Sequence, residues 1–105
     1  MKVNIDLGIV PIGTGVSLSK YIIACHEILD ETGLEIKLHA FGTNIEGEWD
    51  EVMSAVKRCQ EKVHEMGVPR ILTTIKLATR TDREQAMSDK VESVLQRKAK
   101  GQQSQ

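Results

Sequence analysis

Hydrophobic and polar residues alternate along four stretches of the chain, and this period of two is typical of strands with one buried face. The first stretch places Val3, Ile5 and Leu7 on one face. We predict a tight turn at Gly42-Thr43, between the second stretch and a short third one. The four predicted strands are Val3–Ile9, Leu34–Phe41, Asn44–Glu46 and Arg70–Arg80.

Apolar residues recur at the spacing of amphipathic helices in three further stretches. The first helix, Leu18–Leu29, ends before Gly33, and the second, Trp49–Met66, ends before Gly67. A capping box at Thr81-Asp82-Arg83-Glu84 precedes the third helix. We expect four apolar residues of this last helix to point inward, namely Met87, Val91, Val94 and Leu95.

The order strand, helix, strand, strand, helix, strand predicts an α+β, ferredoxin-like fold, in which an antiparallel sheet carries two helices on one face, plus a C-terminal helix. We expect a single ferredoxin-like domain over residues 1–100 and a flexible C-terminal tail over residues 101–105. The other face of the sheet is then polar and of both charges, so it is solvated, forms a subunit contact or lines a polar pocket. The residues expected on that face are Asn4, Asp6, Lys37, His39, Thr74, Lys76 and Arg80.

Charge and hydropathy exclude some partners. The 105 residues carry a formal net charge of −1, which gives no field that favours nucleic acid or an anionic membrane. No apolar run approaches the roughly 20 residues of a membrane-spanning helix, and the N-terminus lacks the apolar segment of a signal peptide. We therefore expect a cytoplasmic protein with neither a nucleic-acid nor a membrane partner.

RNA-recognition motifs share the predicted order of elements, but they stack bases on aromatic residues of two central strands. Aromatic residues make up only 3% of this chain. The corresponding strands offer Asp6, Gly8, Thr74 and Lys76. The sequence therefore excludes this mode of RNA binding.

The cysteine and histidine residues indicate neither a metal site nor thiol catalysis. Cys25 and His26 are neighbours that diverge on a helix, and Cys59 and His64 are poorly aligned. Zinc sites and cysteine–histidine dyads need side chains that converge. We expect two reduced cysteines within helices, no metal and no cofactor.

Three separated motifs resemble the small thiamine-binding protein family, which was first catalogued as an uncharacterised protein family. The motifs are Val10-Pro11-Ile12-Gly13-Thr14, Gly42-Thr43-x-x-Glu46-Gly47-x-Trp49-Asp50-Glu51-Val52 and Arg70-x-x-Thr73-Thr74-x-Lys76-x-x-x-Arg80-x-Asp82. The match covers nearly the whole chain in the right order. The resemblance implies a ferredoxin-like fold, self-assembly through the sheets into dimers and tetramers, and binding of thiamine or its hydroxymethylpyrimidine part.

Several side chains suit such a ligand. A thiazolium cation favours a carboxylate, and an aminopyrimidine favours hydrogen-bond acceptors and a flat surface. Glu46 can supply the charge, Thr43 a hydroxyl and either Phe41 or Trp49 a ring. Lys76 and Arg80 suit a phosphate or a carboxylate better, which leaves a phosphorylated form of the vitamin open. The expected ligand-binding residues are Phe41, Thr43, Glu46, His39, Thr74, Lys76 and Arg80.

Structural interpretations of these residues stay open. Glu46 can instead place its charge at the start of the second helix, Thr43 can bond to the backbone of the turn, and Lys76 and Arg80 can form salt bridges. We predict a non-catalytic small-molecule-binding protein, with its site near the sheet face and a subunit interface of a dimer of dimers. The alternatives are a structural homo-oligomer or a regulatory protein of unknown ligand and, less favoured, an enzyme that uses Glu46 as general base.

Overall fold

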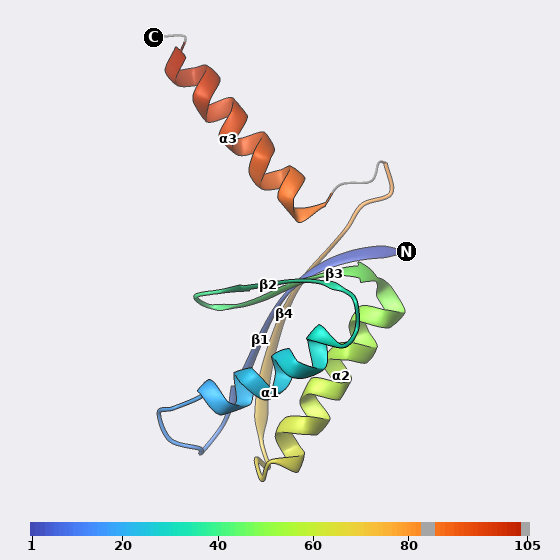
Figure 1. Ribbon diagram of the computed structural model, residues 1–105, viewed down its shortest axis with the longest axis vertical. Helices are drawn as coiled ribbons and strands as arrows, with labels where there is room; N and C mark the ends of the chain where they lie inside the picture. Colours follow the sequence, from blue (N-terminus) through green and yellow to red (C-terminus); the bar gives the residue numbers. More distant parts are fainter. Residues whose placement is uncertain (83–85, 104–105) are drawn as a thin grey trace.

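Four antiparallel strands form one sheet in the computed structural model of the chain, which describes residues 1–82 and 86–103 (Figure 1). The strands lie side by side in the order β2-β3-β1-β4. Helices α1 and α2 cover one face of the sheet, and α3 follows the last strand. The elements are β1 (Lys2–Pro11), α1 (Ser19–Asp30), β2 (Glu35–His39), β3 (Gly42–Glu48), α2 (Trp49–Glu65), β4 (Ile71–Thr79) and α3 (Met87–Gln103). This arrangement confirms the predicted α+β, ferredoxin-like fold.

The hydrophobic core lies between the sheet and the two helices that cover it. The alternation along β1 turns Val3, Ile5 and Leu7 toward the helices, where each is at most 4% exposed. Ile45 of β3 meets them from the neighbouring strand and is fully buried. The helices contribute Leu29, Val52, Cys59 and Val63. Because the core is almost entirely aliphatic, its stability depends on close packing of small branched side chains.

The turn between β2 and β3 lies earlier in the chain than predicted. Residues 40–41 form the turn, and His39 pairs with Gly42 across it. The predicted turn at Gly42-Thr43 is therefore wrong, since both residues belong to β3. Gly42 allows β3 to approach β1 closely, because a Cβ at this position would lie 2.6 Å from the carbonyl oxygen of Leu7.

The pairing of β3 decides which face each of its side chains occupies. Thr43 and Ile45 point toward the helices, whereas Asn44 and Glu46 point to the opposite face, which we call the open face. The middle of the open face is polar, as predicted, whereas the paired Val10 and Leu72 make one end of it apolar. One row of neighbours on it consists of Lys37, Asn44, Asp6 and Lys76.

The C-terminal helix α3 begins at Met87, later than the predicted capping box. The carboxylate of Asp89 accepts the backbone N–H of Ala86 at 3.0 Å and so caps the first turn. Arg83 and Glu84 of the predicted capping box lie outside the described residues. The division into a domain over residues 1–100 and a flexible tail over residues 101–105 stays a prediction.

Most of α3 projects away from the rest of the chain (Figure 1). Val91, Val94 and Leu95 are 54%, 65% and 54% exposed, so the prediction that they point inward is wrong. Met87 in the first turn is half-buried. Helical periodicity identifies an apolar stripe but does not say what covers it. Within the described residues, no helix has the length and apolar character that crossing a membrane requires.

Replacing Gly42 by alanine is expected to destabilise the fold. The new Cβ would press on the carbonyl oxygen of Leu7, and a backbone atom in a paired strand has little room to move. We expect Gly42→Ala to lower the free energy of unfolding by about 1–3 kcal/mol, measured by urea denaturation.

Gly47→Ala is the matched control on the same strand. Its Cβ would meet the terminal Cδ2 atom of Leu34, which can rotate away. We expect a loss of about 1 kcal/mol or less. Equal losses in the two variants would contradict the proposed role of the backbone contact.

Candidate functional site

The sheet separates the predicted binding residues into two groups. Thr43 and Glu46 are three positions apart on β3, so their side chains lie on opposite faces. Thr43 adjoins a cavity on the helix side, and Glu46 adjoins a different cavity on the open face. A single small ligand bound to one chain cannot contact both side chains.

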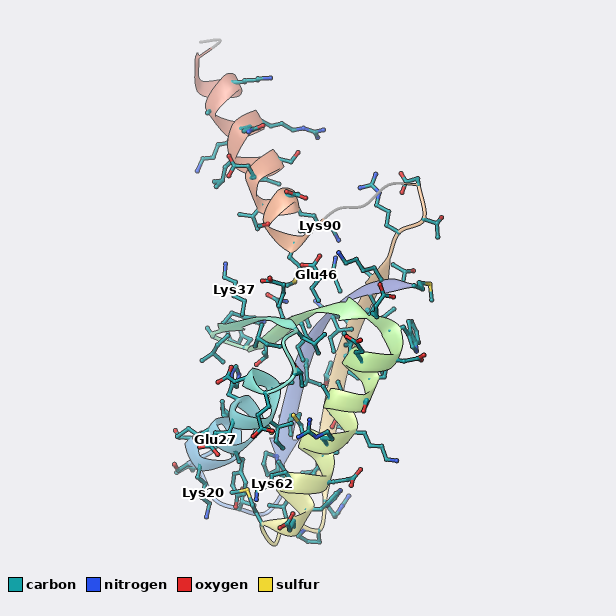
Figure 2. All side chains as sticks on the ribbon, turned by 45° about the vertical axis from the view of Figure 1, so that its right-hand side comes forward. Lys20, Glu27, Lys37, Glu46, Lys62 and Lys90 are labelled. Carbon is teal, nitrogen blue, oxygen red and sulfur yellow. The ribbon has the colours of Figure 1, made fainter. Side chains whose placement is uncertain are left out.

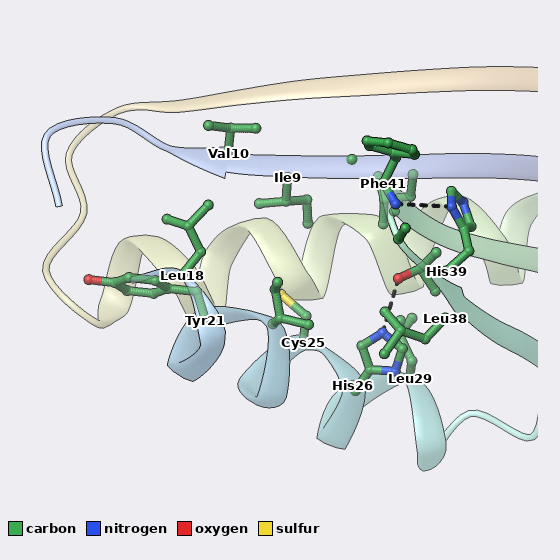
Figure 3. A pocket seen from close by; sticks show the side chains of 16 residues that line it. Ile9, Val10, Leu18, Tyr21, Cys25, His26, Leu29, Leu38, His39 and Phe41 are labelled. Atoms are coloured by element: carbon green, nitrogen blue, oxygen red, sulfur yellow. Dashed lines mark hydrogen bonds between the residues drawn. The ribbon is translucent and has the colours of Figure 1, made fainter. Parts of the chain in front are cut away.

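The first cavity, which we call the hairpin cavity, lies between α1 and the turn of the β2–β3 hairpin (Figure 3). Its volume is about 230 Å³, and apolar side chains form most of its wall. Phe41 at the turn is 93% exposed, so its ring forms a wall of the cavity that is open to solvent. Its lining includes Leu7, Ile9, Leu18, Cys25, His26, Leu29, His39, Phe41 and Thr43.

Three polar side chains at the hairpin cavity already have partners. The Thr43 hydroxyl and His26 Nε2 form a hydrogen bond of 3.0 Å, so Thr43 bonds to a side chain and not to the turn backbone. His39 Nδ1 accepts the backbone N–H of Phe41 at 3.2 Å. His39 Nε2 therefore carries the ring proton and donates it to Asp6 Oδ1 at 2.7 Å. These bonds hold the hairpin turn against β1 and α1.

The second cavity, which we call the acidic cavity, lies between the open face at β2 and β3 and the first turns of α3. Its volume is about 450 Å³. Figure 2 shows Lys37 and Glu46 on the side of the sheet that α3 approaches. Three carboxylates and one ammonium adjoin this cavity, so its local charge is negative. Its lining residues are Glu35, Ile36, Lys37, Asn44, Glu46, Met87, Ser88, Val91 and Glu92.

Glu46 is the most unusual side chain of the acidic cavity. It is only 7% exposed, and it forms no hydrogen bond or ion pair with any residue in 1–82 or 86–103. Its cross-strand neighbours are Asn4 on one side and Glu35 on the other. Two carboxylates directly opposite each other on one face of a sheet repel. A cation that joined the two carboxylates would relieve this repulsion.

Glu46 does not cap α2. The residue that precedes this helix is Glu48, and its carboxylate instead accepts a hydrogen bond from the N-terminal amino group of Met1 at 3.0 Å. Two residues separate Glu46 from the helix start at Trp49. The structural interpretation of Glu46 as an N-terminal helix charge therefore has no contact to support it.

The remaining predicted residues lie outside both cavities. Thr74 and Lys76 are exposed on β4. Arg80 follows the strand and donates to both carboxylate oxygens of Asp82, at 2.6 and 2.9 Å. This bond raises the pKa of Arg80 above its ordinary value. None of the three is brought to Glu46.

The structure separates Glu46 from His39 along the hairpin. His39 pairs with Gly42, four positions along β3 from Glu46, which corresponds to roughly 13 Å. Within the part of the chain that the structure describes, no group of three or more His, Cys, Asp or Glu side chains is arranged to hold a metal ion.

Sequence reasoning missed several residues of the two cavities. Glu35 could have been found, because it shares the alternation of Lys37 and His39 and faces Glu46 once β3 begins at Gly42. Glu92 gives no local signal, since only the placement of α3 brings it to the cavity. In the sequence, His26 is not a candidate site residue because its side chain diverges from that of Cys25 on the helix. In the structure, it bonds to Thr43 of β3 instead.

Comparisons with known proteins agree with this architecture. A UPF0045 protein of Synechocystis sp. is 54% identical over 94 residues, which cover 90% of this chain and 78% of that protein. A UPF0045 protein of Eremothecium gossypii is 44% identical and covers 86% of this chain and 87% of its own length. These relatives do not form an established enzyme family.

Solved structures show the same fold. A hypothetical protein of Methanocaldococcus jannaschii has a TM-score of 0.82 at 31% identity, covering 89% of this chain and 95% of that one. A Thermotoga maritima protein provisionally assigned to thiamine biosynthesis or salvage has a TM-score of 0.76 at 21% identity, covering 90% and 99%. The latter likeness shows the fold alone.

The three motifs noted in the sequence lie on the hairpin, on the start of α2 and on the two paired strands β1 and β4. The model of a family described as thiamine-binding protein matches residues 5–95. This match covers most of the chain, and the relatives agree with it in length and in fold. The chain therefore belongs to the thiamine-binding protein family.

Proposed function

We propose that the chain is a non-catalytic binder of thiamine or of a compound built on its hydroxymethylpyrimidine part, and that the ligand occupies the acidic cavity. The observation that carries this proposal is the Glu46 side chain, which is 7% exposed, has no hydrogen-bond or ion-pair partner among the described residues and lies opposite Glu35. A cationic ring between these side chains would neutralise the repulsion. The family description supports a ligand of this class.

The size and lining of the acidic cavity suit such a ligand. Its volume of about 450 Å³ lies within the roughly 300–1,000 Å³ of typical small-molecule sites. The thiazolium ring would lie near Glu46 and Glu35, and the amide of Asn44 offers an acceptor to the pyrimidine amino group. Met87 offers a thioether against which an aromatic ring can pack.

We favour binding over catalysis because the structure brings no histidine to Glu46, and its neighbour Glu35 is a like charge with no hydrogen bond to it. A general base needs a partner within hydrogen-bond reach of the reacting group, and His39 is engaged with Asp6 at the other end of the hairpin. A regulatory protein of unknown ligand is the alternative that these contacts leave. We place the protein in the cytoplasm, which the free thiols Cys25 and Cys59 support.

We also propose that copies of the chain assemble into a homotetramer as a dimer of dimers, through the open face and α3. Val10 and Leu72 are paired neighbours on the open face and are 46% and 59% exposed. The stripe of Val91, Val94 and Leu95 on α3 is similarly exposed. Such apolar surfaces on two sides of one molecule are typical of subunit contacts.

Removing the Glu46 charge is expected to weaken thiamine binding. Glu46→Gln keeps the shape of the side chain but loses the charged interaction, which is worth about 1.5–3 kcal/mol. Isothermal titration calorimetry should show a dissociation constant about 10- to 100-fold weaker than that of the original protein.

Glu61→Gln is the matched control for this experiment. It removes the same charge from an exposed position on α2, away from the acidic cavity. We expect it to leave affinity unchanged. Unchanged affinity in Glu46→Gln as well, or no binding of thiamine by the original protein, would refute the proposed site.

Phosphorylated thiamine is expected to bind less well than thiamine. Glu35, Glu46 and Glu92 would repel a diphosphate group, and Lys37 alone cannot compensate for three carboxylates. In parallel titrations we expect thiamine diphosphate to bind at least about tenfold more weakly. Equal or tighter binding of the diphosphate would place the ligand elsewhere on the chain.

A charge on the open face is expected to disrupt assembly. Leu72→Lys places an ammonium in the proposed contact and should lower the mass measured by sedimentation equilibrium to that of a smaller oligomer. Ile23→Lys is the control, because Ile23 on α1 is 58% exposed, as Leu72 is at 59%, but lies on the helix side. Equal masses for all three proteins would contradict the proposed interface.

A further inference from the structure

The two cysteines of the chain meet between α1 and α2, behind the hairpin cavity. The Cys59 thiol donates a hydrogen bond to the carbonyl oxygen of Cys25 at 3.7 Å. Cys25 lines the hairpin cavity, on its α1 side below Ile9 (Figure 3). Cys59 is fully buried and does not line it. Both cysteines are free thiols.

The position of the two thiols makes them chemically unequal. The Cys59 thiol beside it lowers the pKa of Cys25, although burial acts in the opposite direction. The same contact, together with burial, raises the pKa of Cys59. The thiolate is the reactive form of cysteine. The thiol that faces the cavity is therefore the one that ionises first.

We infer that the hairpin cavity admits a small alkyl hydroperoxide to Cys25, and that Cys59 then closes a disulfide between α1 and α2. In the first step the Cys25 thiolate attacks the terminal peroxide oxygen, the O–O bond breaks, and an alcohol leaves after taking up a proton. Cys25 becomes a sulfenic acid. In the second step the Cys59 sulfur attacks the Cys25 sulfur, the S–O bond breaks, and water leaves. The hydroperoxide is reduced, and both thiols are oxidised.

The lining of the cavity selects an apolar oxidant. Leu7, Ile9, Leu18 and Leu29 surround the approach to Cys25. His26 Nε2, the Thr43 hydroxyl and both ring nitrogens of His39 are already hydrogen-bonded, so these atoms do not favour a charged or strongly hydrated reagent. A volume of about 230 Å³ lies below the roughly 300–1,000 Å³ of typical ligand sites, so it suits only a small reagent such as a short alkyl hydroperoxide.

The first step itself prepares Cys59 for the second. The contact with Cys25 is the largest cause of the raised pKa of Cys59, ahead of burial. Once Cys25 is a neutral sulfenic acid, its negative charge no longer opposes ionisation of Cys59. The attacking sulfur is already close, because the Cys59 thiol lies 3.7 Å from the backbone carbonyl oxygen of Cys25 in the reduced protein.

Intact-mass spectrometry of the full chain tests this reaction. After treatment with tert-butyl hydroperoxide, the original protein should lose the mass of two hydrogen atoms, and a digest should contain a peptide pair joined through Cys25 and Cys59. Cys59→Ala should stop at the sulfenic acid, which dimedone traps on Cys25. Cys25→Ala should leave Cys59 unmodified. Both variants are first checked for native circular dichroism.

Two comparisons make the test specific. Relative to free cysteine, the protein should prefer tert-butyl hydroperoxide over hydrogen peroxide, because only the former gains from an apolar cavity. In Cys59→Ala the pH at half-maximal rate of Cys25 alkylation by iodoacetamide should be higher than in the original protein, because the neighbour that lowers the pKa of Cys25 is gone. An unchanged mass of the original protein, or oxidation of Cys59 in Cys25→Ala at the original rate, would overturn the inference. None of these readouts depends on thiamine binding.

Discussion

The pairing of β3 with its neighbours is the constraint on which the rest of the structure depends. Ile5 lies opposite Ile45 on β1 and β3, and this pair sets both strands with their apolar residues toward the helices. A slip of one residue would turn every side chain of β3 to the other face. Ile45 would then leave the core, and Glu46 would enter it. The burial of Ile45 thus decides that the Glu46 carboxylate lies on the open face.

Most of the fold could be predicted, because apolar burial leaves a periodic trace in sequence. Four alternating stretches and two amphipathic helices are enough to specify the order of elements. The hairpin turn could not be placed, because a glycine that allows close approach of Leu7 has the same local signature as a glycine that forms a turn. The exposure of Val94 and Leu95 could not be predicted, because it depends on contacts and not on period.

The candidate site could be predicted only in part, for a related reason. Glu46 was found because a carboxylate before a helix is conspicuous, and its neighbours on β2 follow once the register is known. The structure does not bring Glu46 together with Thr43 and Phe41 within one chain, since residues an odd number of positions apart along a strand lie on opposite faces. Closeness in sequence within a strand is therefore a poor guide to which side chains share a site. Strand pairing is a better guide, because it places Glu35 beside Glu46.

One wall of the acidic cavity comes from α3, the helix that packs least against the rest of the fold. Within residues 1–82 and 86–103, α3 has no extensive packing against another element, and its first turns supply Met87 and Glu92 to the cavity. Whatever fixes α3, whether a bound cation or a second copy of the chain against its exposed stripe, therefore also fixes the distance between Glu92 and Glu46. The free energy that couples two such binding events is the same in both directions. A bound cation that draws α3 toward the sheet should favour the position of α3 that a partner subunit covers. Ligand binding and assembly should therefore strengthen each other.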